Sequence, residues 1–236
     1  DVPVLMHEDP RSIAGHVSAF VMGTTDLGLQ VFGVTGTNGK TSTVFFLYQL
    51  LLEMGVKAGL SSSAFTQIDN QRADSVLTTP EAPRLHRLLS EMKAAGAKAA
   101  VVEVSAQALV RHRVDGLVFD VAGFTNLTRD HLDEFGSMEN YLSAKASLFT
   151  QKFSGRSVIN VEDNFGEQML ELARAESPGN SVGIGPNQDY NFEVSGDGIK
   201  ITGKQELFLA RDVGPLMSKN LALAAIMLLE AGYSPK

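Results

Sequence analysis

A glycine-rich turn that ends in a lysine and a threonine, Gly-Thr-Asn-Gly-Lys-Thr, occupies residues 36–41. The residues before it, 31–35, are apolar and mostly β-branched, which predicts a buried strand, and the apolar segment 44–54 after it predicts a helix. In such a unit, glycines let successive backbone N–H groups converge on an anion at the positive end of the helix. Lys40 would then reach the β- and γ-phosphates of a nucleotide, and the Thr41 hydroxyl would ligate Mg²⁺. We therefore predict a phosphate-binding P-loop instead of an ordinary turn with a surface lysine.

Two other apolar runs also end in polar side chains. Residues 99–104 place Glu103 at the end of a buried strand, and residues 119–125 lead to the segment Arg-Asp-His at 129–131. A carboxylate beside a P-loop is suited to ligate Mg²⁺, whereas the alternative is an acid that simply meets solvent. Aspartates flank His131, so we favour a metal ligand there. Three other histidines are expected to be structural: His7, His16 and His86.

Lys145 lies in the segment Tyr-Leu-Ser-Ala-Lys-Ala-Ser-Leu-Phe, inside a helix expected at residues 138–150. Its neighbours are mostly small or apolar. The residues alone favour a solvated lysine at the edge of this helix.

Strand and helix patterns alternate along most of the chain. The expected strands are 31–35, 56–61, 99–104, 119–125 and 157–161, and the expected helices are 11–22, 44–54, 81–95, 138–150 and 216–231. Residues 62–76 are expected to be irregular, and residues 190–210 to form a small antiparallel meander. Unbroken apolar strands between helices predict an α/β fold, with a mostly parallel sheet covered by helices on both faces. Ligands of such sheets bind outside the carboxyl ends of the strands, where Lys40, Glu103 and His131 fall.

Composition narrows the class of protein. The chain has 236 residues, a net charge of −7 at pH 7 and a pI near 5.2. An acidic chain without a basic stripe disfavours nucleic acid as a partner, and the lack of cysteine excludes disulfides and thiol catalysis. With no signal peptide and no apolar run of membrane length, we expect a cytoplasmic protein. Residues 1–30 have no initiator methionine and are expected to be the tail of a preceding domain and a linker.

Residues 33–41, Gly-Val-Thr-Gly-Thr-Asn-Gly-Lys-Thr, have valine where a common P-loop has its first glycine, and resemble the ATP loop of the Mur ligases and the related folylpolyglutamate synthetases. Further motifs follow in the order of the Mur ligases: Leu-Thr-Thr-Pro-Glu-Ala-Pro at 77–83, Glu-Val-Ser at 103–105, His-Arg-Val at 112–114, Thr-Asn-Leu-Thr-Arg-Asp-His-Leu-Asp at 125–133 and Ala-Lys-Ala-Ser-Leu-Phe at 144–149. Residues 31–236 are thus similar to the central ATP-binding domain of this family. The resemblance is strongest to members that add a diamino acid as the third residue of the peptidoglycan stem.

The resemblance implies roles for individual residues. ATP would be bound by Gly36, Thr37, Asn38, Gly39, Lys40, Thr41 and Ser42, with Asn160 and Asn220 near the adenine. A first Mg²⁺ would be held at Thr41, and a second by Glu103, His131 and Lys145, the last as a carbamate that turns a cation into an anion. The UDP-muramoyl-peptide would be contacted by Thr78, Thr79, Ser105 and Arg113. The catalytic group would be Lys40, Glu103, His131 and Lys145.

Three stretches depart from the family pattern. The family commonly has Glu-Val-Ser-Ser-His where this chain has Glu-Val-Ser-Ala-Gln, so Ala106 and Gln107 replace a hydroxyl and an imidazole. Arg111 stands where a neutral polar or small residue is usual, and Leu216-Met217 replaces a Phe-Asn pair. We expect the first two departures to change contacts with the peptide of the acceptor, and the third to weaken the assignment of the adenine site.

The implied reaction is ATP-dependent amide-bond formation. ATP would phosphorylate the terminal carboxylate of UDP-MurNAc-L-Ala-D-Glu, and the amine of a diamino acid, meso-diaminopimelate or L-lysine, would attack the acyl phosphate. The family also has an N-terminal and a C-terminal domain, so we expect these residues to be a monomeric central domain that does not ligate by itself. The alternatives are a ligase similar to folylpolyglutamate synthetase and a non-catalytic Mur-like nucleotide-binding subunit.

Overall fold

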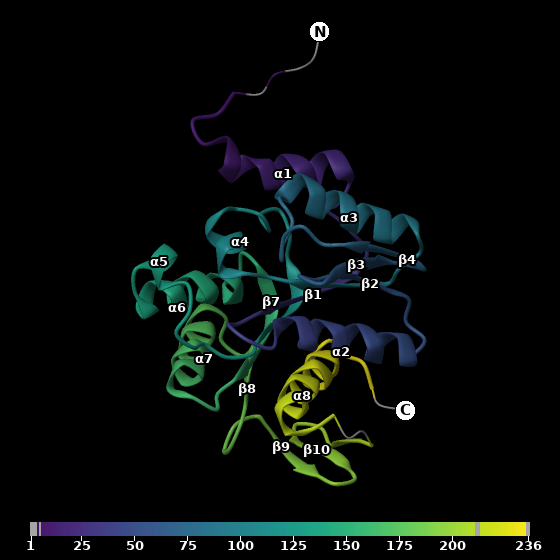
Figure 1. Cartoon of the computed structure of the whole chain (residues 1–236), viewed down its shortest axis with the longest axis vertical. Coiled ribbons are helices and arrows are strands. Elements are labelled where there is room, and N and C mark those ends of the chain that lie inside the picture. The colour runs from purple at the N-terminus through teal and green to yellow at the C-terminus, as the bar shows by residue number, and fades with distance from the viewer. Residues whose placement is uncertain (1–3, 5, 211–212, 235–236) are drawn as a thin grey trace.

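The computed structural model describes residues 4, 6–210 and 213–234. Within these residues, eleven strands form one sheet in the order β11-β10-β9-β8-β7-β6-β1-β5-β2-β3-β4 (Figure 1). The six central strands run parallel: β1 Gln30–Thr35, β2 Ala58–Ser61, β5 Ala99–Glu103, β6 Phe119–Phe124, β7 Ser154–Asn160 and β8 Ser181–Ile184. The expected α/β fold with a mostly parallel sheet is confirmed.

Helices cover both faces of the parallel strands, which is why these strands are apolar without interruption. In β1, Val31 packs into the core on one face and Phe32 into the core on the other. The face of Val31 carries α3 Ala82–Ala94, α4 Ala106–Val110, α6 Met138–Ala146 and α7 Asn164–Glu176, and the face of Phe32 carries α2 Lys40–Glu53 and α8 Pro215–Glu230. Burial of each large apolar side chain contributes roughly 1.5–3 kcal/mol, so both layers fix β1 and the turn that follows it.

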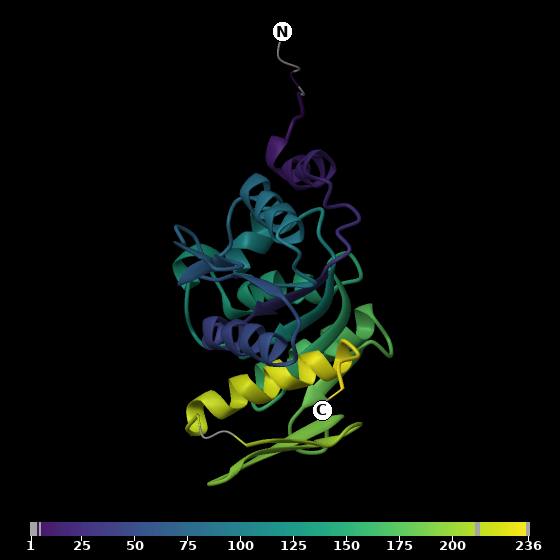
Figure 2. The same ribbon diagram turned by 90° about the vertical axis from the view of Figure 1, so that its right-hand side faces the viewer.

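Two pairs of neighbouring helices complete these layers. The N-terminal helix α1, Pro10–Met22, packs against α3 (Figure 1). Figure 2 shows α8 alongside α2 beneath the sheet, with Leu221 and Val44 in the same core. The last helix of the chain therefore lies beside the helix that follows the P-loop.

Antiparallel strands extend the sheet at both ends. The expected meander is present as β9 Tyr190–Ser195, β10 Gly198–Gly203 and β11 Leu207–Leu209, and it continues the sheet because β9 joins β8. At the other edge, β3 Phe65–Ile68 and β4 Gln71–Asp74 form a hairpin, so the irregular structure expected for residues 62–76 is wrong.

The physical reason for that error is the polarity of β4, the second strand of the hairpin. Every residue of β4 is exposed, so β4 has no apolar run that would indicate a strand. The turn has Asp69 in the left-handed region at φ 51°, which is typical of a tight hairpin. The Arg72 guanidinium stacks 3.6 Å from the centre of the Phe65 ring and holds the two strands together.

The other differences lie in the short elements and their ends. The helix expected at 138–150 ends at Ala146 and continues as a 3₁₀ turn, Ser147–Phe149. A one-turn helix, α5 Leu132–Phe135, follows the Arg-Asp-His segment and was not expected, nor were α4, α7 and β8. None of the helices in the described part of the chain is both long and apolar enough to cross a membrane.

Candidate functional site

The glycine-rich turn joins the carboxyl end of β1 to the first turn of α2, as the sequence predicts. The segment after β6 is hydrogen-bonded to the turn. The Thr37 N–H donates to the Asn126 carbonyl at 2.9 Å, and the Asn38 N–H donates to the Asn126 side-chain oxygen at 3.0 Å. The Thr125 hydroxyl donates to the Asn38 carbonyl at 2.7 Å. Gly39, with φ at 85°, precedes α2 and brings no side chain to the start of the helix. The turn is therefore preformed to receive an anion at a helix N-terminus.

Gly36 is the turn residue with the least room for a side chain. Its φ is 147°, and an added Cβ would lie 1.8 Å from the Thr125 hydroxyl oxygen. We predict that Gly36→Ala lowers the free energy of unfolding by about 3 kcal/mol or more, because backbone strain and a clash act together. Urea unfolding measures this loss, and Gly55→Ala is the matched control because Gly55 has a positive φ of 77° but open space around its Cβ position. Equal losses in the two variants would contradict the prediction.

Two lysine ammonium groups meet at the carbonyl of Gly36. Lys40 Nζ donates to it at 3.1 Å and to the Thr37 carbonyl at 2.8 Å. Lys145 Nζ, which comes from α6, donates to the same Gly36 oxygen at 2.7 Å. The structure thus brings together two of the four predicted catalytic residues at the P-loop itself.

The solvated lysine that the residues alone favour at position 145 is wrong. Lys145 is 1% exposed, and its Nζ lies 4.3 Å from the centre of the Tyr141 ring. Burial, and then repulsion by Lys40, lower the pKa of Lys145 to about 6, while attraction to Asp130 acts in the opposite direction. A large share of Lys145 is therefore a neutral amine near pH 7.

Glu103 lies at the end of β5 and is 2% exposed. Its carboxylate accepts hydrogen bonds from the Thr41 hydroxyl at 3.0 Å and from the Ser63 N–H at 2.8 Å. Burial lowers the pKa of Lys40, and attraction to Glu103 opposes that shift. In proteins Mg²⁺ takes one or two oxygen ligands from side chains and the others from water and phosphates. The Thr41 hydroxyl and the Glu103 carboxylate fit such a donor set.

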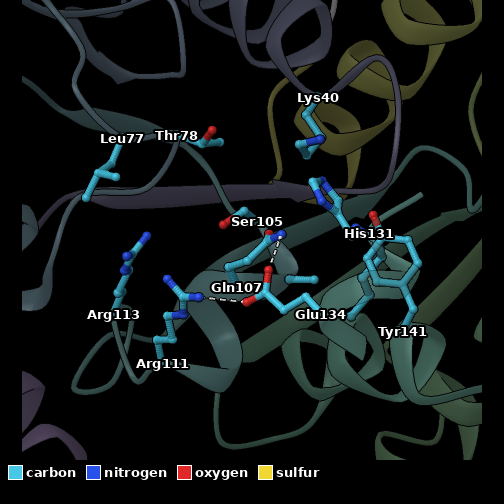
Figure 3. A pocket seen from close by; sticks show the side chains of 12 residues that line it. Lys40, Leu77, Thr78, Ser105, Gln107, Arg111, Arg113, His131, Glu134 and Tyr141 are labelled. Atoms are coloured by element: carbon cyan, nitrogen blue, oxygen red, sulfur yellow. Dashed lines mark hydrogen bonds and ion pairs between the residues drawn. The ribbon is translucent and has the colours of Figure 1, made fainter. Parts of the chain in front are cut away.

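His131 precedes α5 and has the left-handed backbone conformation, with φ at 51°. Its ring lies 3.4 Å from the Asp130 carboxylate and edge-on to Tyr141, and its side chain is 46% exposed. It lines the same cavity as Lys40 and Lys145 (Figure 3). Within the described residues, no group of three or more His, Cys, Asp or Glu side chains gathers as a metal site.

This cavity, which we call the acceptor cavity, has a volume of about 270 Å³ and lies on the Lys40 side of the P-loop (Figure 3). It is lined by Lys40, Leu77, Thr78, Ser105, Ala106, Gln107, Arg111, Arg113, His131, Glu134, Tyr141 and Lys145. Besides Lys145 and His131, the cations Lys40, Arg111 and Arg113 face a single carboxylate, Glu134, within this lining. Such a lining favours an anionic ligand.

Of the residues predicted to contact the acceptor, Thr78, Ser105 and Arg113 line the acceptor cavity, whereas Thr79 lies behind it. Thr79 is fully buried, and its hydroxyl donates to the Glu103 carbonyl at 2.8 Å and accepts from the Ser105 N–H at 3.0 Å. It therefore fixes the exit of β5. Arg113 is held by Glu81 at 2.8 Å and by the Thr79 carbonyl at 3.3 Å, and its buried Nε has no partner within the described residues.

A second cavity, the nucleotide cavity, lies on the other side of the P-loop and has a volume of about 490 Å³. It is lined by Asn38, Gly39, Ser42, Thr125, Asn126, Thr128, Asn160, Glu162, Asp163, Met217, Lys219 and Asn220. The predicted residues Ser42, Asn160 and Asn220 thus face one space. Asn160 Nδ2 donates to the Thr125 carbonyl at 3.0 Å. Met217, one half of a departure from the family pattern, lines this cavity, while the side chain of Leu216 lies outside the described part of the chain.

Sequence reasoning missed several of these residues. Asn126 and Thr128 lie in the predicted motif at 125–133 but were given no role of their own. Glu162 and Asp163 follow β7, so the strand-end rule that selected Glu103 could have found them. Glu134 gave no comparable signal, because it lies in a one-turn helix that the sequence pattern did not reveal.

Comparison with known proteins identifies the family. The family described as the Mur ligase middle domain matches residues 34–227. The chain belongs to the Mur ligase family. A Leifsonia xyli subsp. xyli protein named UDP-N-acetylmuramyl-tripeptide synthetase is 42% identical to this Mur ligase domain, over 98% of the domain and 47% of that protein. An Aquifex aeolicus protein named UDP-N-acetylmuramoyl-L-alanyl-D-glutamate–2,6-diaminopimelate ligase is 34% identical, over 99% of the domain and 49% of that protein. The domain spans about half the length of these curated relatives.

Solved structures share the fold of this Mur ligase domain. A UDP-N-acetylmuramoyl-L-alanyl-D-glutamate–2,6-diaminopimelate ligase superposes with a TM-score of 0.86 at 24% identity, covering 98% of the domain and 49% of that chain. E. coli FolC, in complex with DHPP and ADP, superposes with a TM-score of 0.72 at 20% identity, covering 94% of the domain and 58% of that chain. At these identities the likeness concerns the fold alone.

Proposed function

We propose that this Mur ligase domain is the ATP-binding part of a cytoplasmic ligase of peptidoglycan precursor synthesis, which adds a diamino acid to UDP-MurNAc-L-Ala-D-Glu. The observation that carries the proposal is the position of the P-loop between two cavities, with Lys40 facing the cationic one. A nucleotide in the nucleotide cavity would present its γ-phosphate to an anionic acceptor in the other. The printed names of the relatives support this substrate class.

The proposed reaction has two steps. First, a carboxylate oxygen of the acceptor attacks the γ-phosphorus of ATP, the bond to the bridging oxygen breaks, and ADP leaves. The loop N–H groups and Lys40 offset the charge that develops on the phosphate oxygens. Then the amine nitrogen of the diamino acid attacks the acyl carbon, inorganic phosphate leaves, and the new amide nitrogen loses a proton to water.

Mg²⁺ fits this proposal at Thr41 and Glu103, where it would supply further neutralisation of the phosphate charge. For a second ion we propose Glu103, His131 and Lys145. As an ammonium group Lys145 repels a cation, so the proposal requires its carbamate. The low pKa of Lys145 supports this assignment, because only the neutral amine reacts with CO₂.

The proposal is tested with the complete protein that contains this domain, ATP, Mg²⁺ and UDP-MurNAc-L-Ala-D-Glu. Phosphate release and the mass of the product are measured with meso-diaminopimelate and with L-lysine as amine. We expect a muramoyl-tripeptide with one of the two amines, and no ligation by the 236-residue chain alone. A folate acceptor with glutamate is the comparison arm. Turnover of the folate in place of the muramoyl acceptor would support the synthetase alternative, and nucleotide binding without turnover of any acceptor would support the non-catalytic one.

A further inference from the structure

Glu134 links the two facing walls of the acceptor cavity (Figure 3). Its Oε1 accepts a hydrogen bond from the Arg111 guanidinium at 2.8 Å, and its Oε2 accepts one from the Gln107 amide at 3.1 Å. Gln107 belongs to α4 and Arg111 directly follows it, whereas Glu134 belongs to α5. Both oxygens of this one carboxylate thus bind the opposite wall.

Apart from Glu134, the helix that carries it is held mainly through Phe135, which is partly buried against the core. α5 is one turn long and none of its four residues is buried. On one side, Phe135 lies 4.9 Å from the Tyr141 ring, and the Phe135 carbonyl accepts from Asn140 at 2.9 Å. On the other side, Glu134 supplies the link to α4. The position of α5 therefore depends on these few contacts.

The position of α5 matters because His131 immediately precedes it. His131 is a non-glycine residue with φ at 51°, a conformation that costs free energy and persists where neighbouring contacts impose it. A shift of α5 would move the His131 ring, which shares the acceptor cavity with Lys40 and Lys145. Loss of the link at Glu134 would therefore change the position of the His131 ring through the backbone.

Gln107 and Arg111 are also two of the positions at which we expect this sequence to depart from the Mur ligase pattern. In the structure both side chains bind the same carboxylate. We propose that Glu134 is a positioning residue, which sets the distance between α4 and α5 and thereby holds His131 and Arg111 in place around the acceptor. This inference rests on the proposed function.

The test uses the complete protein and the variants Glu134→Ala and Glu134→Gln. For Glu134→Ala we expect kcat to fall about fivefold to tenfold with the KM for ATP within about twofold, because the nucleotide cavity is untouched. Glu134→Gln is expected to recover most of this loss, because its amide oxygen still accepts from Arg111. In a protein that carries Arg111→Ala and Gln107→Ala, Glu134→Ala is expected to cause no further loss.

Hydrogen exchange gives a second measurement that does not depend on catalysis. In Glu134→Ala, the backbone amides of residues 131–136 are expected to exchange at least about threefold faster, with those of α2 unchanged. Glu91→Ala is the matched control, since Glu91 also binds two arginines, Arg84 and Arg87, but lies on α3 outside both cavities. It is expected to leave kcat unchanged.

Unchanged exchange and unchanged kcat in Glu134→Ala would overturn the inference, as would a full additional loss in the doubly substituted background. A wild-type protein that makes no muramoyl product would instead refute the proposed function. The exchange data would still report whether Glu134 holds α5.

Discussion

Lys40→Ala is expected to reduce ATP-dependent ligation by the complete protein at least about a thousandfold. Lys40 is the P-loop cation that faces the acceptor cavity, where the γ-phosphoryl group would pass from ATP to the carboxylate. Its Nζ donates to the carbonyls of Gly36 and Thr37, so the side chain is directed along the turn. Without the Lys40 ammonium, the negative charge on the phosphoryl oxygens in the transition state loses a nearby positive charge. The ratio kcat/KM from product formation measures the effect.

Lys57→Ala serves as the control for Lys40→Ala. Lys57 forms an ion pair with Asp69 at the surface and lines neither cavity. Its removal is expected to leave kcat/KM within about twofold of the wild type, because exposed ion pairs contribute little. Near-normal turnover of Lys40→Ala would remove the P-loop from the mechanism.

Lys145→Met is expected to abolish ligation and at the same time to stabilise the domain. Lys145 is fully enclosed, so its charge is costly in the fold and its pKa is lowered to about 6. Methionine has a similar length without the charge, and the Gly36 carbonyl keeps its hydrogen bond from Lys40. We expect a gain on the order of 2 kcal/mol near pH 7, or roughly 4–8 °C in Tm. Loss of function with gain of stability is typical of a group retained for chemistry.

The pH dependence of this gain has a definite sign. The pKa of Lys145 is about 6 in the folded domain and 10.5 by reference in the unfolded chain. Between these values the unfolded state binds more protons, so the stability of the wild type rises with pH relative to the variant. The advantage of Lys145→Met is therefore largest below about pH 6 and shrinks toward pH 10.

Urea unfolding at several pH values, in buffer depleted of CO₂ so that Lys145 stays an amine, measures this difference. Lys98→Met is the control, because it makes the same change at an exposed lysine. Two results would contradict the assignment of Lys145 as a buried amine whose charge is costly. One is a Lys145→Met domain that is less stable than the wild type, and the other is a stability difference that does not change with pH.

The sequence was sufficient to predict the site where the functional residues lie next to the strands and helices that position them. The P-loop was predictable because the strand, the turn and the helix that build it are contiguous, and Glu103 because it ends a buried strand. The parallel sheet followed from the unbroken apolar runs. These predictions depend on residues a few positions apart, where local periodicity carries the information.

The errors concern contacts between distant parts of the chain. The buried Lys145 ammonium donates its hydrogen bond to the carbonyl of Gly36, 109 positions away. Nothing in the residues next to Lys145 indicates that contact. Arg111 and Gln107 were recognisable as departures, but their common partner Glu134 lies 23 and 27 positions further on, in a helix too short to show a pattern. The hairpin at residues 65–74 was missed because its second strand, β4, is polar and fully exposed.

The place of α8 beside α2 has a consequence for protein synthesis. Met217, Lys219 and Asn220 complete one wall of the nucleotide cavity, although the P-loop emerges from the ribosome almost 180 residues earlier. A nascent chain therefore carries its phosphate turn long before it has the surface that would enclose the base of a nucleotide. On the proposed function, tight capture of ATP would have to wait until translation has passed residue 220 and α8 has docked.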